Sequence, residues 1–209
     1  MTELWLFFMA LTVAYLLPGP DMILVLQTGA RQGKGAALAT AVGLGVARAC
    51  HVALAAMGLS VLFKTAPWTF DVVRLAGAAY LAWIGFQCLR TTLLPSFEGD
   101  AAAIGKRQWH QAIQRGLLTN LLNPKALLFC SVLLPQFIDP QDGPVLGQFA
   151  ILGVVLVGVG LLFDSAYALV GMALGRWLQR SPSAQRAQQW LFGSLLIGFA
   201  VRLTFVQQS

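Results

Sequence analysis

The fold of this chain is decided by Leu17-Pro18-Gly19-Pro20-Asp21, a proline-centred break in an apolar run near the N-terminus. A second break, Asn123-Pro124-Lys125, interrupts another apolar run in the second half. Proline removes one helical hydrogen bond, so Pro18 frees the carbonyl of Ala14. Within hydrocarbon, such a break is tolerated where it is buried in protein or lines a watery cavity. The two breaks therefore predict an internal site in a helical membrane protein.

The composition around these breaks is that of a membrane protein. Of the 209 residues, 57% are hydrophobic and 11% are charged, which is about half the charged share of a soluble domain. The mean hydropathy of +0.71 agrees. These values exclude a soluble enzyme, a disordered chain and a secreted disulfide scaffold. The net charge of +6 comes from basic residues scattered between apolar runs, so we expect no nucleic-acid partner.

Six apolar segments are long enough to cross a bilayer, which takes about 20 residues of helix. They lie at roughly Leu4–Thr28, Ala36–Phe63, Val72–Leu89, Gln114–Ile138, Val145–Gly171 and Ala187–Phe205. We predict an all-α integral membrane protein with six transmembrane helices, of which the first and fourth are broken, in a single domain over residues 1–209. Nine basic residues in the first, third and fifth loops against three on the opposite side predict that both termini lie outside the cytoplasm.

The two halves of the chain share features at a spacing of 113 residues. The tripeptides Ile84-Gly85-Phe86 and Ile197-Gly198-Phe199 match, and His51 corresponds to Asp164. Three helices per half is an odd number, so the second half has to enter the membrane upside down, as in many secondary transporters. We predict two inverted three-helix repeats at about 1–94 and 113–209, joined by a cytoplasmic linker at about 95–112.

Each break also has the sequence of a helix start, because a capping residue precedes a proline. On this interpretation Gly19 and Asn123 cap two half-helices that begin at Pro20 and Pro124. The free N–H groups of such half-helices point into the membrane interior, where they can bind an anion.

Asp21 and Lys125 occupy matching positions in the first turns of these half-helices. An acidic residue favours the helix dipole there, so Asp21 is open to a purely structural interpretation. A lysine opposes the dipole. We therefore expect Lys125 to have a function, namely to receive the carboxylate of a substrate together with the N–H groups that follow Asn123.

Four charged residues and one histidine lie within the predicted spans: Asp21, Arg48, His51, Lys125 and Asp164. A charge at the bilayer centre costs about 2.5–3.5 kcal/mol on insertion scales, so these side chains are expected to face inward and to pair. One interpretation makes Arg48 and Asp164 a structural ion pair and His51 a buried histidine bonded to a carbonyl. The other assigns all three to proton coupling or gating.

Two rows of small residues at i, i+4 spacing predict close helix packing beside these groups. The rows are Gly35, Ala39, Gly43, Ala47, His51 and Ala55, and Gly153, Val157, Gly160, Asp164, Ala168 and Gly171.

The intramembrane polar groups suit a zwitterion such as an amino acid. Positive groups can receive its carboxylate, and carboxylates with freed carbonyls can accept its ammonium. The predicted substrate-binding residues are Asp21, Asn123, Lys125, Pro20 and Pro124, and the predicted proton-coupling or gating residues are His51, Asp164 and Arg48. We expect no catalytic residue, no metal and no cofactor.

The chain resembles the LysE/RhtB family of bacterial amino-acid exporters. The resemblance rests on residues 17–21, 43–51, 74–81 with Gly85, and 116–126. It implies proton-driven efflux of amino acids or small derivatives from the cytoplasm by a multi-pass protein of the bacterial inner (plasma) membrane, as a homodimer. The family often has a small or weakly polar residue where this chain has Arg48, which indicates either altered selectivity or a local salt bridge.

Two other functions compete with amino-acid export. An ion or metal-cation permease is the main alternative, although it calls for clustered ligands, and the two histidines of this chain are far apart. A membrane enzyme is the other, although the chain has no C-x-x-C or H-E-x-x-H motif. We therefore expect a transporter and not an enzyme.

Overall fold

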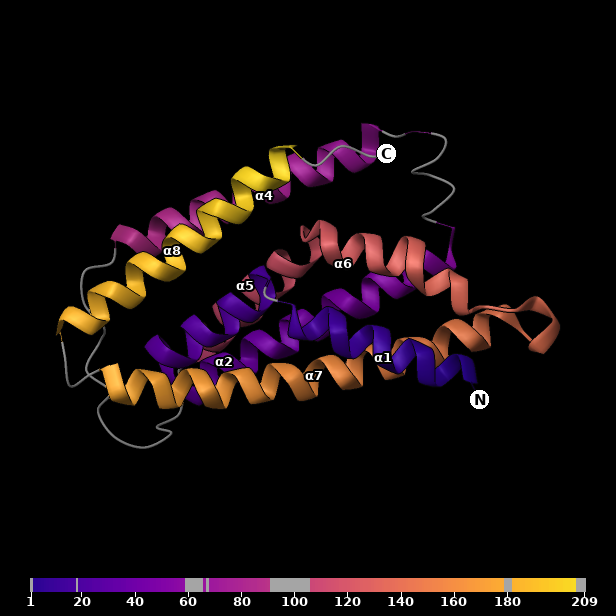
Figure 1. Ribbon diagram of the computed structural model, residues 1–209, viewed down its shortest axis with the longest axis horizontal. Coiled ribbons are helices and arrows are strands. Elements are labelled where there is room, and N and C mark those ends of the chain that lie inside the picture. The colour runs from indigo at the N-terminus through magenta and orange to yellow at the C-terminus, as the bar shows by residue number, and fades with distance from the viewer. Residues whose placement is uncertain are drawn as a thin grey trace.

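The computed structural model describes residues 2–17, 19–58, 66, 68–90, 106–178 and 182–205. Within these residues the chain forms helices and no strands, which confirms the predicted all-α class. The elements are α1 (Thr2–Leu16), α2 (Pro20–Ala56), α4 (Trp68–Arg90), α5 (Lys106–Leu121), α6 (Pro124–Leu128), η1 (Phe129–Leu133), η2 (Leu134–Phe137), η3 (Pro140–Asp142), α7 (Val145–Leu178) and α8 (Pro182–Phe205). In Figure 1, α7 runs along most of the molecule beside α1 and α2, and α4 lies beside α8.

Helix α2 folds back on itself at a single residue. Gly33 is non-helical, with φ 84° and ψ 177°, a conformation that is essentially restricted to glycine. A straight helix would hold Asp21 and Arg48 about 40 Å apart, but their charged groups are 3.7 Å apart. The sequence predicts a connection between spans ending at Thr28 and starting at Ala36, and the chain does reverse within that stretch, at a single glycine and without an extended loop.

The second break is a bend of 59° between residues 107–121 and 125–137. Helix α5 ends at Leu121, and α6 starts at Pro124 with Asn123 as its capping residue, as the sequence predicts. The π-helix η1 and the 3-10 helix η2 follow. Irregular turns of this kind occur often at functional sites. Helix α5 already begins at Lys106, so helix extends into the segment interpreted as a linker.

The predicted rows of small residues lie at close helix crossings. A Cβ atom on Gly43 would collide with the carbonyl of Ile113 in α5, and one on Gly171 would collide with the carbonyl of Leu26 in α2. Helix α2 therefore packs against α5 through one row and against α7 through the other, at distances that only glycine allows.

The matching tripeptides do not pack equivalently. A Cβ atom on Gly85 would meet the carbonyl of Gly193 at the crossing of α4 and α8, whereas one on Gly198 would meet open space.

Helices α2 and α7 are long and apolar enough to cross a membrane, the bent α5–α6 segment adds a third candidate, and shorter apolar helices lie at Leu4–Leu16, Leu75–Gln87 and Trp190–Arg202. These lengths fit a membrane protein, while the arrangement of six spans in inverted repeats stays a prediction.

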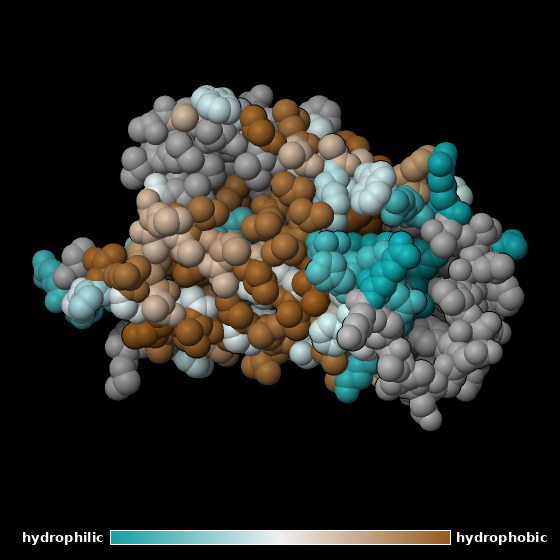
Figure 2. All heavy atoms as spheres, turned by 180° about the vertical axis from the view of Figure 1, so that it is seen from behind, coloured by the Kyte–Doolittle hydropathy of each residue, from teal (hydrophilic) through white to brown (hydrophobic). Residues whose placement is uncertain are grey.

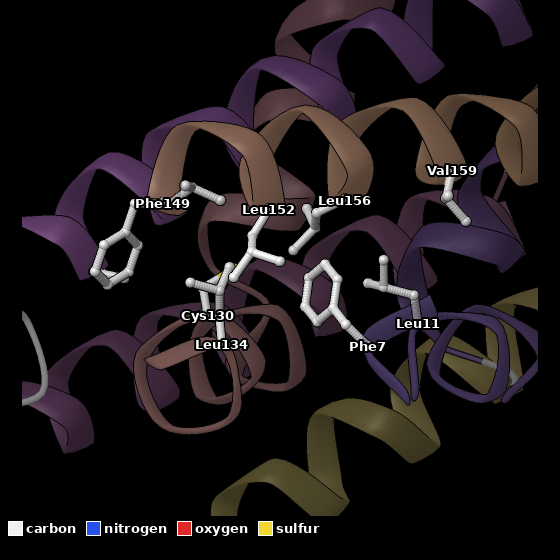
Figure 3. Close-up of a cluster of buried hydrophobic side chains, with 10 residues drawn as sticks. Phe7, Leu11, Cys130, Leu134, Phe149, Leu152, Leu156 and Val159 are labelled. Atoms are coloured by element: carbon white, nitrogen blue, oxygen red, sulfur yellow. The ribbon is translucent and has the colours of Figure 1, made fainter. Parts of the chain in front are cut away.

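Apolar side chains both fill the core and cover the outside. Figure 3 shows the cluster in which Phe7 and Leu11 of α1 meet Leu134 of η2 and Leu156 of α7. On the surface, Figure 2 shows apolar side chains spread over the middle of one face and hydrophilic ones gathered toward its ends. The exposed side chains include Leu146, Val154 and Leu162 of α7. Such a surface suits hydrocarbon better than water.

Candidate functional site

A cavity of about 70 Å³ lies where the two helix breaks meet. The breaks are adjacent because the Asn123 side chain donates a hydrogen bond to Asp21 at 3.0 Å. Pro20 is buried at the start of α2 and precedes Asp21, and Pro124 starts α6 and precedes Lys125. The polar and charged residues that line the cavity are Tyr15, Asp21, Arg48, Asn120, Asn123, Lys125, Asp164 and Tyr167.

Asp21 is held by groups from both halves of the chain. Its two carboxylate oxygens accept hydrogen bonds from the side-chain amides of Asn120, at 2.6 Å, and Asn123, at 3.0 Å. The guanidinium of Arg48 lies 3.7 Å away. An ionised carboxylate inside a membrane needs such donors, and these contacts fix its position at the cavity wall.

Arg48 and Asp164 form a buried ion pair. Two guanidinium nitrogens of Arg48 donate to the two carboxylate oxygens of Asp164, at 2.5 and 3.3 Å. Their side chains are 3% and 2% exposed, and the guanidinium also lies 5.0 Å from the centre of the Tyr15 ring. The expected acidic partner of Arg48 within the protein is thereby confirmed.

Lys125 bonds to the C-terminal end of α1. Its ammonium donates to the carbonyl oxygens of Ala14, at 2.6 Å, and Leu17, at 3.1 Å. Because Pro18 has no N–H, the carbonyl of Ala14 lacks its helical donor, and Lys125 supplies a replacement. The backbone N–H of Lys125 is itself taken by the Asn123 side chain at 3.1 Å. At the expected anion site, the Lys125 ammonium therefore points toward backbone carbonyls. The first N–H after Asn123, that of Lys125, is already bonded to the Asn123 side chain.

His51 lies deeper, against α5, and does not line the cavity. Its Nε2 is 3.1 Å from the backbone oxygen of Asn120, a carbonyl that also accepts the backbone N–H of Asn123 at 3.0 Å. A carbonyl only accepts, so this contact requires the tautomer with a proton on Nε2. Nδ1 of His51 is buried with no hydrogen-bond partner among the described residues. The geometry agrees with the interpretation of a buried histidine bonded to a carbonyl and does not pair His51 with Asp164.

Of the polar and charged side chains that line the cavity, three were not singled out from the sequence. Asn120 holds Asp21, and the hydroxyl of Tyr15 donates to the carbonyl of Leu156 at 3.0 Å. Tyr167 donates in turn to the carbonyl of Tyr15 at 2.9 Å. Asn120 could have been found, because it lies one turn before Asn123 in an otherwise apolar run and so shares its helix face. The tyrosines carry no comparable signal.

The chain matches the family model of the LysE type translocator over residues 4–207. A homoserine/homoserine lactone efflux protein of Salmonella typhimurium is 34% identical over 205 residues, which cover 94% of each chain. A leucine efflux protein of Enterobacter sp. is 31% identical over 199 residues, 95% of this chain and 93% of the relative. An uncharacterized membrane protein of Pseudomonas aeruginosa is 32% identical over 204 residues, 97% and 94% of the two chains.

No solved structure matches the chain. Within the described residues, no group of three or more His, Cys, Asp or Glu side chains is placed to hold a metal ion, and the relatives are named as efflux proteins of amino acids and a lactone, so a metal-cation permease gains no support. The family match and the apolar helices make this chain a multi-pass membrane transporter and not an enzyme. It belongs to the LysE type translocator family.

Proposed function

We propose that this protein is a secondary transporter that exports amino acids or close derivatives from the cytoplasm in exchange for protons. The family and the named relatives support amino-acid efflux, with homoserine, homoserine lactone and leucine as the first compounds to test. The observation that carries the proposal is the charge arrangement at the cavity. Two cations and two anions, Arg48, Lys125, Asp21 and Asp164, line one space at the meeting of two helix breaks.

Such a cavity is complementary to a zwitterion. Among the described residues, the side chain of Lys125 donates to two backbone carbonyls, which are neutral partners. A substrate carboxylate can therefore bind Lys125 without breaking an existing ion pair. Asp21, held by Asn120 and Asn123, is the anion nearest the same break, and its negative charge attracts the substrate ammonium. Pro20 and Pro124 contribute by interrupting the helices and keeping carbonyls free.

The cavity as it stands represents a closed state. Its volume of about 70 Å³ is well below the roughly 300–1,000 Å³ of small-molecule pockets. An amino acid therefore needs movement of the helix ends around the breaks before it binds. Helix breaks are suited to this, because a few residues at the end of an element can absorb the change in backbone angles.

Proton coupling is assigned to the shared guanidinium of Arg48. It lies 2.5 Å from a carboxylate oxygen of Asp164 and 3.7 Å from one of Asp21. A proton that binds either carboxylate removes one charge partner and leaves Arg48 to the other, which changes the contact between α2 and α7. His51 would sense the same change through Asn120, whose side chain bonds Asp21 and whose carbonyl contacts the histidine.

The test is efflux from proteoliposomes loaded with radiolabelled leucine or homoserine. An acidic external buffer should accelerate efflux above that of protein-free liposomes, and a protonophore should remove the acceleration. If neither amino acid leaves the proteoliposomes faster than it leaves loaded liposomes without protein, the proposal of export is wrong. If efflux is fast but indifferent to the pH gradient and the protonophore, export stands and proton coupling is wrong.

The proposed coupling residues need a variant of their own. Asp164→Asn keeps the shape of the carboxylate but cannot exchange a proton at neutral pH. It is expected to retain exchange of labelled for unlabelled amino acid while losing the response to the pH gradient. Equal loss of both activities would indicate a structural role for Asp164. The inner-membrane location and the homodimer that the family resemblance implies stay predictions.

A further inference from the structure

The ammonium of Lys125 occupies a site made by another helix. Lys125 follows the second break, yet its Nζ is bonded to two carbonyls at the end of α1, 111 and 108 positions earlier in the chain. We infer that the C-terminal end of α1 is a binding subsite for a primary ammonium group, and that Lys125 is its internal occupant until a substrate amine replaces it. The identification of that amine with an amino acid rests on the proposed function.

The subsite has the features that an ammonium requires. Ala14 offers a carbonyl that proline deprives of its helical donor, and Leu17 offers a second. The C-terminus of a helix carries a partial negative charge that attracts cations. Ala14, Leu17, Asp21 and Lys125 all line the same cavity, so the acceptors face the space that a substrate enters.

The chemistry predicts selectivity for primary amines. An ammonium of the R-NH3⁺ type has three N–H donors, and the two carbonyls already use two of those of Lys125. A quaternary ammonium has the same charge and no donor, so it cannot replace these bonds.

Exchange at this subsite gives Lys125 two roles in sequence. While the cavity is closed, the lysine ammonium satisfies the helix end and keeps α1 joined to α6. When a substrate ammonium takes the carbonyls, the displaced lysine is free to meet the carboxylate of the same substrate. The net charge of the cavity does not change when a zwitterion enters, so no charge has to be left unpaired in the membrane.

The test uses the purified protein in detergent and simple amines as probes. Lys125→Ala removes the internal occupant and leaves the carbonyls exposed to the cavity. Butylammonium chloride at roughly five times its dissociation constant should raise the midpoint of thermal unfolding of this variant by about 2–4 °C. The parent should respond less, because the amine has to displace the lysine ammonium that fills its subsite. Tetramethylammonium chloride and sodium chloride serve as salts of equal ionic strength, and Lys34→Ala is the matched variant of an exposed lysine outside the cavity.

The outcomes separate this inference from the proposed function. Stabilisation of Lys125→Ala by butylammonium alone supports the subsite even if no amino acid is exported. Equal stabilisation of the parent, of Lys34→Ala, or by tetramethylammonium would overturn it, and so would a response to sodium alone, which would assign the carbonyls to a metal cation. If Lys125→Ala does not accumulate, Lys125→Met with methylammonium provides the same comparison, since its stem fills the space of the butyl chain. No response in either variant rejects the subsite while leaving amino-acid export intact.

Discussion

The side chain of Lys125 donates a hydrogen bond to the carbonyl of Ala14 at 2.6 Å and thereby ties the second helix break to the first. A carbonyl without a donor is costly inside a membrane. The sequence places a lysine where the dipole of its own helix repels it, and the structure supplies the reason, because the lysine acts at the C-terminus of a different helix. The charge of Lys125 and the C-terminal end of α1 therefore meet in a single contact at the cavity.

Replacing Lys125 should affect both stability and export. Lys125→Met keeps the stem but leaves the Ala14 carbonyl without a donor, which is expected to cost about 1–3 kcal/mol. Export should be abolished, because the charge that meets the substrate carboxylate is gone. Lys125→Arg should retain the stability and only part of the export, since a guanidinium has a different shape and reach. The export rates of both variants are measured as efflux of a radiolabelled amino acid, normalised to the amount of the protein in the membrane. Export at the parental rate by Lys125→Met would remove this residue from the site.

The ion pair between Arg48 and Asp164 should show strong non-additivity. Arg48→Met alone leaves a buried carboxylate short of its partner and is expected to cost about 3–5 kcal/mol, as is Asp164→Leu alone. The double variant should recover most of this loss, because neither charge is then left uncompensated. Reversible unfolding in mixed detergent micelles is the measurement. Losses that simply add would mean that the two side chains do not depend on each other.

The glycines at helix crossings should differ sharply from those that face open space. Gly43→Ala and Gly116→Ala each drive a Cβ into a backbone carbonyl of the facing helix, at an expected cost of about 1–3 kcal/mol. Gly158→Ala and Gly198→Ala meet nothing within 4 Å and should be neutral or stabilise by about 0.4–1 kcal/mol. Thermal midpoints of the four purified variants test this. Similar midpoints for all four would contradict the close packing of α2 against α5.

Gly33 should resist substitution for a backbone reason. At φ 84° and ψ 177°, a residue with a Cβ is strained by about 1–3 kcal/mol. Gly33→Ala is therefore expected to weaken the fold-back of α2 and, with it, the contact between Asp21 and Arg48. A lower thermal midpoint together with reduced export is the expected result. An unchanged midpoint would mean that α2 reverses without this conformation.

Much of the candidate site was visible in the residues themselves. Pro18 and Pro124 predict the helix breaks because proline has no N–H to donate. The charges of Arg48 and Asp164 predict that these side chains face the protein interior, because hydrocarbon does not solvate a charge. The Gly43 row predicted the close packing of α2 because small side chains admit a neighbouring backbone. These effects are local, so they can be deduced from residue type and spacing alone.

The partners of these groups were decided only by the tertiary structure. The 113-residue spacing relates His51 to Asp164, but Asp164 bonds Arg48, and His51 contacts the carbonyl of Asn120. From the sequence one can infer that a buried charge or an unpaired carbonyl needs a partner. Many residues could serve as that partner, and the sequence does not distinguish among them. Which one is chosen depends on which segments the long-range packing of α2 against α5 and α7 brings within about 3 Å. The reversal at Gly33 likewise brings Asp21 to Arg48, and no spacing along the chain encodes that contact.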